Sequence, residues 1–384
     1  MSRANAIEKK PLNNVRDSNL ELFRIIVMFL IVAHHYVVNS GLIDSAGPIY
    51  SNMLSWRSIF LLIFGAWGKI GINCFVLISG YFMCTSKISA KKFVKLLGEV
   101  MFYRIIIQSI FWISGYSAFS LSAFVKAFIP VTSIGTGFTP AYLMFFLCIP
   151  FLNMLVNAMN EKQHIRLLLI CLFTYVVLGN FRWFSVTMNY VSWFIVLYFI
   201  ASYVRLYPKK IFSKTKVWGW LTVATVALSV LSIVASVLLG ANWERRAYRF
   251  VTDSNALLAL AVGFCSFMFF KNVKVKKCRF INAVGATTFG VFLIHANSNA
   301  MRTWLWKDTL NNVGMYDSFW MPVHAIASVI MIFVICSAID YLRIRFVERP
   351  FFKLWDKKWD RISNWYMKTE SKICKQLNIE ENEK

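Results

Sequence analysis

The stretch "LFRIIVMFLIVAHHYVV", residues 22–38, decides the fold class. A helix rises about 1.5 Å per residue, so roughly 20 apolar residues cross the hydrocarbon core of a bilayer. This stretch fits such a helix, yet it carries Arg24 near its start and the pair His34 and His35 beyond its middle. Ionisable residues at membrane depth cost a few kcal/mol unless they face protein or water. They are therefore candidates for function.

The composition of the whole chain agrees with a membrane location. Hydrophobic residues make up 58% and aromatic residues 17% of the 384 residues, which is more than a soluble core needs. The net charge of +24 is spread in short basic groups between apolar runs rather than in one cluster. This distribution is typical of the basic residues that orient membrane proteins, and it argues against nucleic acid as a partner.

Ten apolar stretches are candidates for transmembrane helices, which predicts an all-α, polytopic membrane protein. They lie at residues 20–38, 72–84 together with the residues that lead into it, 100–116, 141–159, 165–180, 190–204, 217–239, 256–270, 280–299 and 320–342. If they alternate in direction, the segments on the side of both termini hold 31 Lys and Arg residues, against eight in the opposite loops. Both termini are therefore predicted to be cytoplasmic.

Three parts of the chain follow from these spans. Residues 1–19 form a polar N-terminal segment without the features of a cleavable signal, and residues 20–346 form the ten-helix domain. Residues 347–384 form a cytoplasmic tail in which Trp355 and Trp359 alternate with lysines. This tail reads as an amphipathic helix on the inner membrane surface.

Arg24 and His35 share one face of the first predicted helix. Eleven residues at about 100° each leave a net offset of only about 20°, whereas His34 lies about 80° from the Arg24 direction. The axial separation of Arg24 and His35 is about 16 Å, with the arginine towards the cytoplasm. One reading is a shared cavity for an elongated anionic molecule whose reactive end reaches the imidazole. The other is that Arg24 extends to the headgroups and His35 bonds a neighbouring helix.

The spacing of Arg24 and His35 resembles the arginine-ten-histidine signature of the acyltransferase family 3 membrane proteins, which O-acetylate bacterial surface polysaccharides and related acceptors. Four further stretches resemble family motifs in the same order: "GINCFVLISGYF" (71–82), "SWFIVLYFIASYVRLY" (192–207), "TFGVFLIHAN" (288–297) and "VERPFF" (347–352). The resemblance covers nearly the whole chain and implies a bacterial cell membrane as its location.

The resemblance implies acetyl-CoA, or another acyl-CoA, as a cytoplasmic donor that Arg24 helps to hold, and it implies a carbohydrate acceptor. His35 is then expected to accept the proton of a sugar hydroxyl as the hydroxyl attacks the thioester, because an imidazole with an ordinary pKa of about 6.5 suits a general base. A transient acyl-histidine is the alternative.

Two positions depart from the family pattern. Many relatives have a basic pair, usually arginine, where this chain has Lys92 and Lys95. The lysines can hold donor phosphates without the bidentate guanidinium fork, or they can anchor the inner leaflet. Many relatives have aspartate at Asn73, whose amide can still hydrogen-bond and is a candidate substrate contact.

Other polar residues are candidates for donor or acceptor binding. Arg104 lies near the cytoplasmic start of the third predicted span, where it can contact donor phosphates or extend to headgroups. His295 and Asn297 lie near the outer end of the ninth and can meet an acceptor sugar. The outer loop "ANWERRAYRF", residues 241–250, can bind acidic sugars or lipid headgroups.

The cysteine pattern and the absence of soluble motifs limit the alternatives. None of the eight cysteines falls in a predicted outer loop, so neither a disulfide framework nor a metal site is expected. The main rival to an acyltransferase is a secondary transporter or glycan flippase, which would show a repeat between chain halves that is not seen. A non-catalytic membrane scaffold is a third possibility, but it does not explain why Arg24 and His35 share one face of the helix.

Overall fold

The computed structural model describes residues 17–131, 137–181, 183, 184, 186, 188–240, 247–251 and 253–376. These residues form helices and turns but no strands, so the predicted all-α class is confirmed. The chain divides into two compact units, residues 1–337 and residues 338–384.

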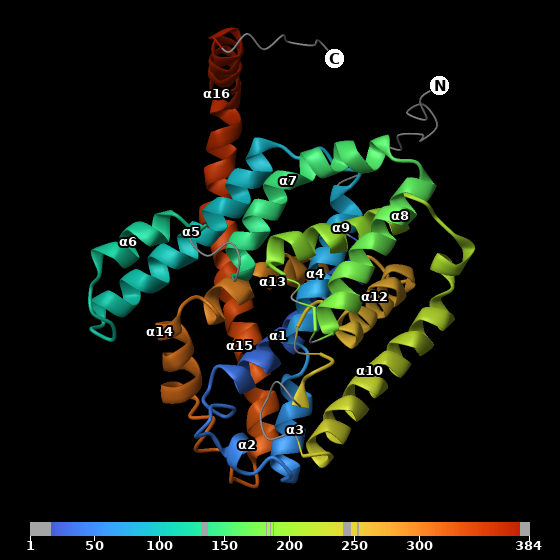
Figure 1. The fold of residues 1–384 in the computed structure, drawn as a ribbon. Helices are drawn as coiled ribbons and strands as arrows, with labels where there is room; N and C mark the ends of the chain where they lie inside the picture. Colours follow the sequence, from blue (N-terminus) through green and yellow to red (C-terminus); the bar gives the residue numbers. More distant parts are fainter. Residues whose placement is uncertain are drawn as a thin grey trace. The chain divides into compact units, whose positions relative to one another are not determined.

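The helices follow one another along the chain with mostly short connections (Figure 1). In the first half they are α1 (Ser18–Val38), α2 (Pro48–Ser51), α3 (Trp56–Gly65), α4 (Gly68–Met83), α5 (Ala90–Ile113), α6 (Leu121–Phe128), α7 (Phe138–Ala158), α8 (Glu161–Leu172) and the π-helix Phe173–Val177 with the 3-10 turn Leu178–Asn180. They continue as α9 (Tyr190–Leu206), the 3-10 turn Lys210–Ser213, α10 (Thr215–Leu238), α12 (Leu257–Asn272), α13 (Arg279–His295), α14 (Asn299–Arg302), the π-helix Thr303–Thr309, α15 (Met321–Arg343), the π-helix Ile344–Glu348 and α16 (Arg349–Gln376).

Helix α1 is the centre of the first unit. It packs against α3, α4, α12 and α13, and Ile26, with 37% exposure, is its only exposed residue. A helix in a bilayer forms its backbone hydrogen bonds within itself. α1 can therefore be enclosed by other helices as long as its side chains pack against theirs. The polar residues of α1 therefore face other helices rather than lipid.

Two glycines allow the neighbours of α1 to come close. A Cβ added at Gly71 in α4 would lie 2.6 Å from Cγ1 of Ile31, and one at Gly285 in α13 would collide with the carboxylate of Glu21. Small residues at helix contacts are the usual means of close packing in membranes. The contacts of α1 with α4 and α13 depend on them.

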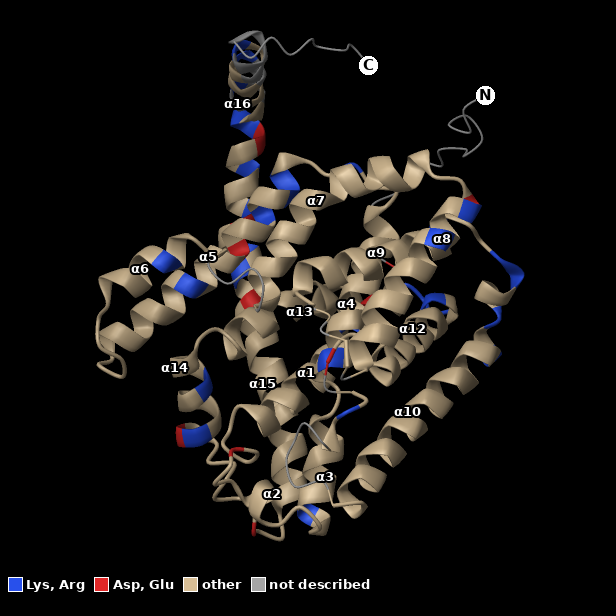
Figure 2. Ribbon diagram, viewed as in Figure 1, with Lys and Arg blue, Asp and Glu red and all other residues tan. Residues whose placement is uncertain are grey.

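Seven of the described helical segments are long and apolar enough to cross a membrane, and an eighth is added if the bent pair Arg279–His295 and Asn299–Thr309 forms one span. Two shorter apolar helices, Tyr190–Leu206 and Leu257–Asn272, coincide with the sixth and eighth predicted spans. The chain is thus a multi-pass membrane protein, and the count of ten stays a prediction. In Figure 2, α10 is tan over almost its whole length, and basic residues gather in the connection between α9 and α10.

The second unit contains the end of α15, the π-helix and α16. Within it, Arg343 donates to Asp340 at 2.7 Å and to Glu348 at 3.0 Å, and all three side chains are buried. Such pairing offsets the desolvation cost of these charges. The rings of Trp355 and Trp359 stack in α16 with centroids 5.4 Å apart. Its location on the inner membrane surface stays a prediction.

Replacement of Gly71 by alanine tests the packing of α1 against α4. We expect the free energy of unfolding to fall by about 1–3 kcal/mol, because the new methyl group forces Ile31 or the helices apart. The thermal unfolding midpoint of the purified protein in detergent measures this change. Gly98→Ala in α5 is the matched control, since nothing lies within 4 Å of its added methyl group. An equal loss in both variants would contradict the proposed close contact.

Candidate active site

A cavity of about 190 Å³ lies where the ends of six helices of the first unit meet. Its lining consists of Met28, Ile31, His34, His35, Gly68, Lys69, Ile72, Phe75, Gly137, Phe138, Tyr190, Phe289, Phe292 and Arg302. Sites that enclose whole drug-sized ligands usually measure roughly 300–1,000 Å³. This cavity therefore suits the reacting ends of two larger molecules better than a complete cofactor.

The face of α1 that carries Arg24 and His35 borders the cavity over two turns. Met28, Ile31 and His35 all line it, and they lie four, seven and eleven residues after Arg24. Arg24 itself is one turn beyond Met28 and is not among the lining residues. Its Nη1 donates to Glu21 at 2.9 Å, and its side chain is 24% exposed. The structure thus brings this face to the cavity and leaves Arg24 just beyond it.

A chain of hydrogen bonds fixes the orientation of His35. Nδ1 of His295 lies 2.6 Å from the carbonyl oxygen of Val291, which can only accept, so this nitrogen carries a hydrogen. In a neutral His295, Nε2 is then an acceptor, and it lies 2.9 Å from Nδ1 of His35. Nδ1 of His35 must donate this bond, which leaves the lone pair of a neutral His35 on Nε2. That nitrogen has no hydrogen-bond partner among the described residues.

His34 is held separately, as its different helical direction predicts. Its Nδ1 donates to the carbonyl oxygen of Gly65 at 2.5 Å, and its ring lies against the backbone of Gly68, where a Cβ would collide with it. Its ring centroid is 5.6 Å from that of His35. His34 therefore helps to close the cavity beside His35 and ties α1 to the junction of α3 and α4.

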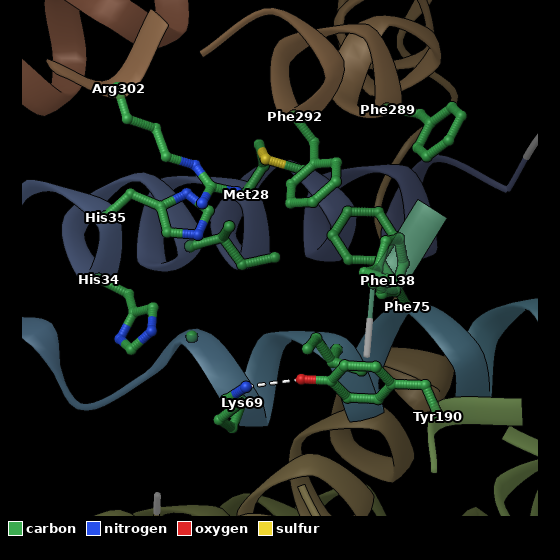
Figure 3. Close-up of a pocket in the computed structure, with 14 residues that line it drawn as sticks. Met28, His34, His35, Lys69, Phe75, Phe138, Tyr190, Phe289, Phe292 and Arg302 are labelled. Atoms are coloured by element: carbon green, nitrogen blue, oxygen red, sulfur yellow. Dashed lines mark hydrogen bonds between the residues drawn. The ribbon is translucent and has the colours of Figure 1, made fainter. Parts of the chain in front are cut away.

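Two cations reach the cavity from other elements. Arg302 comes from α14, which follows α13 after a bend of 96°, and its Nη2 donates to the carbonyl oxygen of Ala296 at 3.3 Å. Lys69 comes from the first turn of α4, and its Nζ donates to the hydroxyl of Tyr190 at 2.6 Å. Figure 3 shows Arg302 alongside His35, and Lys69 bonded to Tyr190 across the cavity.

Phenylalanine rings cover the remaining side of the cavity. Phe292 lies with its centroid 6.1 Å from that of His35, and Phe138 packs edge-to-face on Phe292 at 5.2 Å. Figure 3 shows these rings, together with Phe75 and Phe289, on the side away from Arg302. An apolar wall excludes water and strengthens electrostatic interactions inside the cavity.

Asn73 and Asn297 lie outside the cavity lining. Asn73 is completely buried, donates to the carbonyl oxygen of Ser254 at 2.7 Å and accepts from Nε1 of Trp193 at 2.8 Å, which joins α4 to α9 and to the segment before α12. Asn297, just after the end of α13, donates to the carbonyl oxygen of Leu293 in that helix at 3.0 Å. The structure thus gives Asn73 a connecting role between helices.

The remaining predicted donor contacts belong to α5. Lys92 and Lys95 are exposed near its start, and Nζ of Lys92 donates to the carbonyl oxygen of Lys87 at 2.9 Å. Arg104 lies further along α5 than the predicted span suggests, because the helix begins at Ala90, and its Nη1 donates to the carbonyl oxygen of Lys126 in α6 at 3.2 Å. None of the three lines the cavity. Arg245 and Arg246 of the predicted sugar-binding loop lie outside the described residues.

The cavity contains three polar residues to which the sequence assigned no role: Lys69, Tyr190 and Arg302. Each comes from the beginning of a helix or from a short helix after a bend, so helical periodicity does not connect them with His35. For Lys69, the sequence offers one signal: a lysine that lies three residues before the apolar stretch 72–84. No group of three or more His, Cys, Asp or Glu side chains suited to a metal ion is found within the described part of the chain.

Comparison with protein families gives one result. A family model, described as an acyltransferase domain of the Acyl_transf_3 type, matches residues 17–341. Searches of curated proteins and of solved structures give no match.

The buried amide of Asn73 provides a test of the scaffold. Asn73→Ala removes both of its hydrogen bonds and leaves the Trp193 indole and the Ser254 carbonyl unpaired, so we expect a loss of stability of roughly 2–5 kcal/mol. Thermal unfolding in detergent measures it. Asn297→Ala is the control, since this residue is partly exposed and its side chain bonds only the end of the helix that precedes it. Stability losses of similar size in the two variants would contradict the connecting role of Asn73.

Proposed function

The chain belongs to acyltransferase family 3 and is a membrane acyltransferase; from this premise we propose that it moves an acyl group from cytoplasmic acyl-CoA, with acetyl-CoA as the donor, to a hydroxyl of a cell-surface polysaccharide or lipid-linked glycan. The family match covers the chain from α1 into α15, which includes every residue of the cavity. Donor, acceptor and a bacterial cell membrane as the location are parts of the proposal.

The observation that carries the proposal is the orientation of His35. Its Nδ1–H is engaged by His295, so its Nε2 lone pair is free to accept a proton in the cavity. As the acceptor hydroxyl oxygen attacks the thioester carbonyl carbon, Nε2 takes the hydroxyl proton. His295 acts on His35 rather than on the sugar, because both of its ring nitrogens bond within the protein. The carbonyl of Val291 in turn holds His295 in the required tautomer.

Arg302 is suited to stabilise the charge that develops during the attack. The new C–O bond places a negative charge on the former carbonyl oxygen, and the guanidinium beside His35 can bind it. When the C–S bond breaks, protonated His35 returns the proton to the departing CoA thiolate. The hydroxyl thus becomes an ester, and free CoA thiol leaves.

The arrangement of the helices supports the ten-span topology. α1 and α13, the first and ninth predicted spans, bring their C-terminal ends to the cavity, while α4, α7 and α9, in the second, fourth and sixth, bring their N-terminal ends. These two odd and three even spans therefore run in opposite directions, as alternation requires. With cytoplasmic termini, the cavity lies in the outer half of the membrane.

The donor then enters from the cytoplasmic side along the face of α1 that carries Arg24. Phe289 lines the cavity, and its ring lies 6.1 Å from that of Tyr142. We propose that the pantetheine arm follows this path and that Arg24, Lys92 and Lys95 contact the phosphates. Lys and Arg at this end suit a polyanion.

Removal of the proposed base tests the mechanism. In liposomes with radiolabelled acetyl-CoA and candidate glycans, His35→Ala is expected to lower transfer about 10²- to 10⁴-fold, and Arg302→Met about 10²- to 10³-fold. His295→Gln retains an acceptor for Nδ1–H of His35, so it should keep more activity than His295→Ala.

His324→Gln is the matched control for these variants, because His324 bonds Tyr36 at 2.9 Å and does not line the cavity. It should transfer at close to the wild-type rate. Full activity in His35→Ala would refute the base assignment. Glycan movement across the bilayer without acylation would indicate a transporter instead.

A reporter fused after Lys214 tests the topology. If α9 and α12 both cross the membrane, this position is cytoplasmic, and green fluorescent protein placed there should fluoresce while alkaline phosphatase should be inactive. Without these two crossings, the position is external and the readouts reverse. A fusion at the C-terminus serves as the cytoplasmic control in both cases.

A further inference from the structure

Lys69 has no function in the proposed transfer, although it occupies the cavity. Its Nζ lies 2.6 Å from the hydroxyl of Tyr190 and 5.3 Å from the centre of that ring. Both side chains are half-buried and line the cavity with the phenylalanine rings. The hydroxyl and the ring hold the ammonium group in place, but a neutral phenol does not balance its charge.

The cavity is positive and contains no acidic residue. Lys69 and Arg302 are its two charged residues apart from the histidines, and neither forms an ion pair within the described residues. Elsewhere in the same unit, Arg24 pairs with Glu21, Lys209 with Glu161 and Lys307 with Asp44. A cation at membrane depth without a carboxylate is costly, so its retention points to a ligand that supplies the negative charge.

The helix ends around the cavity add to this positive potential. α4, α7 and α9 all begin at it, and the N-terminus of a helix carries a partial positive charge. Neither α4 nor α7 has a side-chain cap for its first amide groups. A lysine in the first turn of α4 is unfavourable for the helix itself. Helix stability therefore does not explain Lys69.

We propose that one of the two substrates carries a carboxylate group, and that Lys69, positioned by Tyr190, binds this carboxylate while Arg302 serves the oxyanion. This inference rests on the proposed acyl transfer and specifies its substrate class. The carboxylate can belong to the acyl group, as in a dicarboxylic half-thioester such as succinyl-CoA, which then replaces acetyl-CoA as the donor, or to the acceptor, as in a glycan that contains a uronic acid. In both cases the same charge-assisted bonds form at Lys69.

Paired substrates identify the source. The purified protein in liposomes is supplied with butyryl-CoA or succinyl-CoA, which both have four-carbon acyl groups, and separately with a glucose oligosaccharide or its glucuronate counterpart. We expect a preference of about 10- to 100-fold in kcat/KM for the charged member of one pair. Preference within the first pair assigns the carboxylate to the acyl group, and preference within the second assigns it to the acceptor.

Variants connect the preference to Lys69. Lys69→Met, which keeps the length of the side chain, should reduce the preference at least about tenfold, whereas Lys69→Arg should retain most of it. Tyr190→Phe should give an intermediate value, because the ammonium group loses its hydroxyl acceptor. A preference that persists unchanged in Lys69→Met overturns the inference, as does wild-type transfer with equal kcat/KM within both pairs.

Equilibrium binding separates this inference from the proposed function. Affinities of the same four compounds for the detergent-solubilised protein are measured without turnover. Lys69-dependent preference for a charged compound, together with absent transfer, would support the inference and contradict only the transfer reaction. Binding without charge preference overturns the inference whether or not transfer occurs.

Discussion

The hydrogen bond between His35 and His295 is the interaction on which the proposed site depends. It joins α1 to α13 across 260 positions of sequence at 2.9 Å. With Val291 as the final acceptor, it fixes the tautomers of both neutral rings. Because α1 is enclosed by its neighbours, the ring of His35 cannot turn towards lipid instead. The fold and the chemistry thus impose the same orientation.

Part of this site follows from the sequence alone. Helical periodicity places Arg24, Met28, Ile31 and His35 on one stripe, and three of the four line the cavity. The sequence places His295 as a polar residue at the outer end of its span, but it does not predict its contact with His35. Such a contact requires knowing which helices are neighbours, and apolar periodicity in a membrane protein does not specify this. The all-helical class follows from composition with no such knowledge.

The limits of the helices were harder to predict than their existence. The predicted second span has its apolar run at residues 72–84, whereas the structure has a longer apolar segment, Trp56–Met83, made of α3 and α4. Lys69 lies just before that run. A hydropathy window breaks where polar and glycine residues gather, and "GAWGKIG" at 65–71 is such a place. Functional residues in membrane domains concentrate at these breaks, since irregular backbone there lines cavities.

The break after α13 shows why such interruptions matter for the site. Arg302 follows His295 by seven residues, so in a continuous helix it would lie about 10 Å further along the axis, away from His35. The bend of 96° instead turns α14 about perpendicular to α13, and Ser298 starts that short helix by accepting from the amide of Met301 at 3.2 Å. Arg302 is then held by the carbonyl oxygen of Ala296, which lies in the interrupted turn itself. The carbonyl group freed by the break thus positions the cation that the break brings to the cavity.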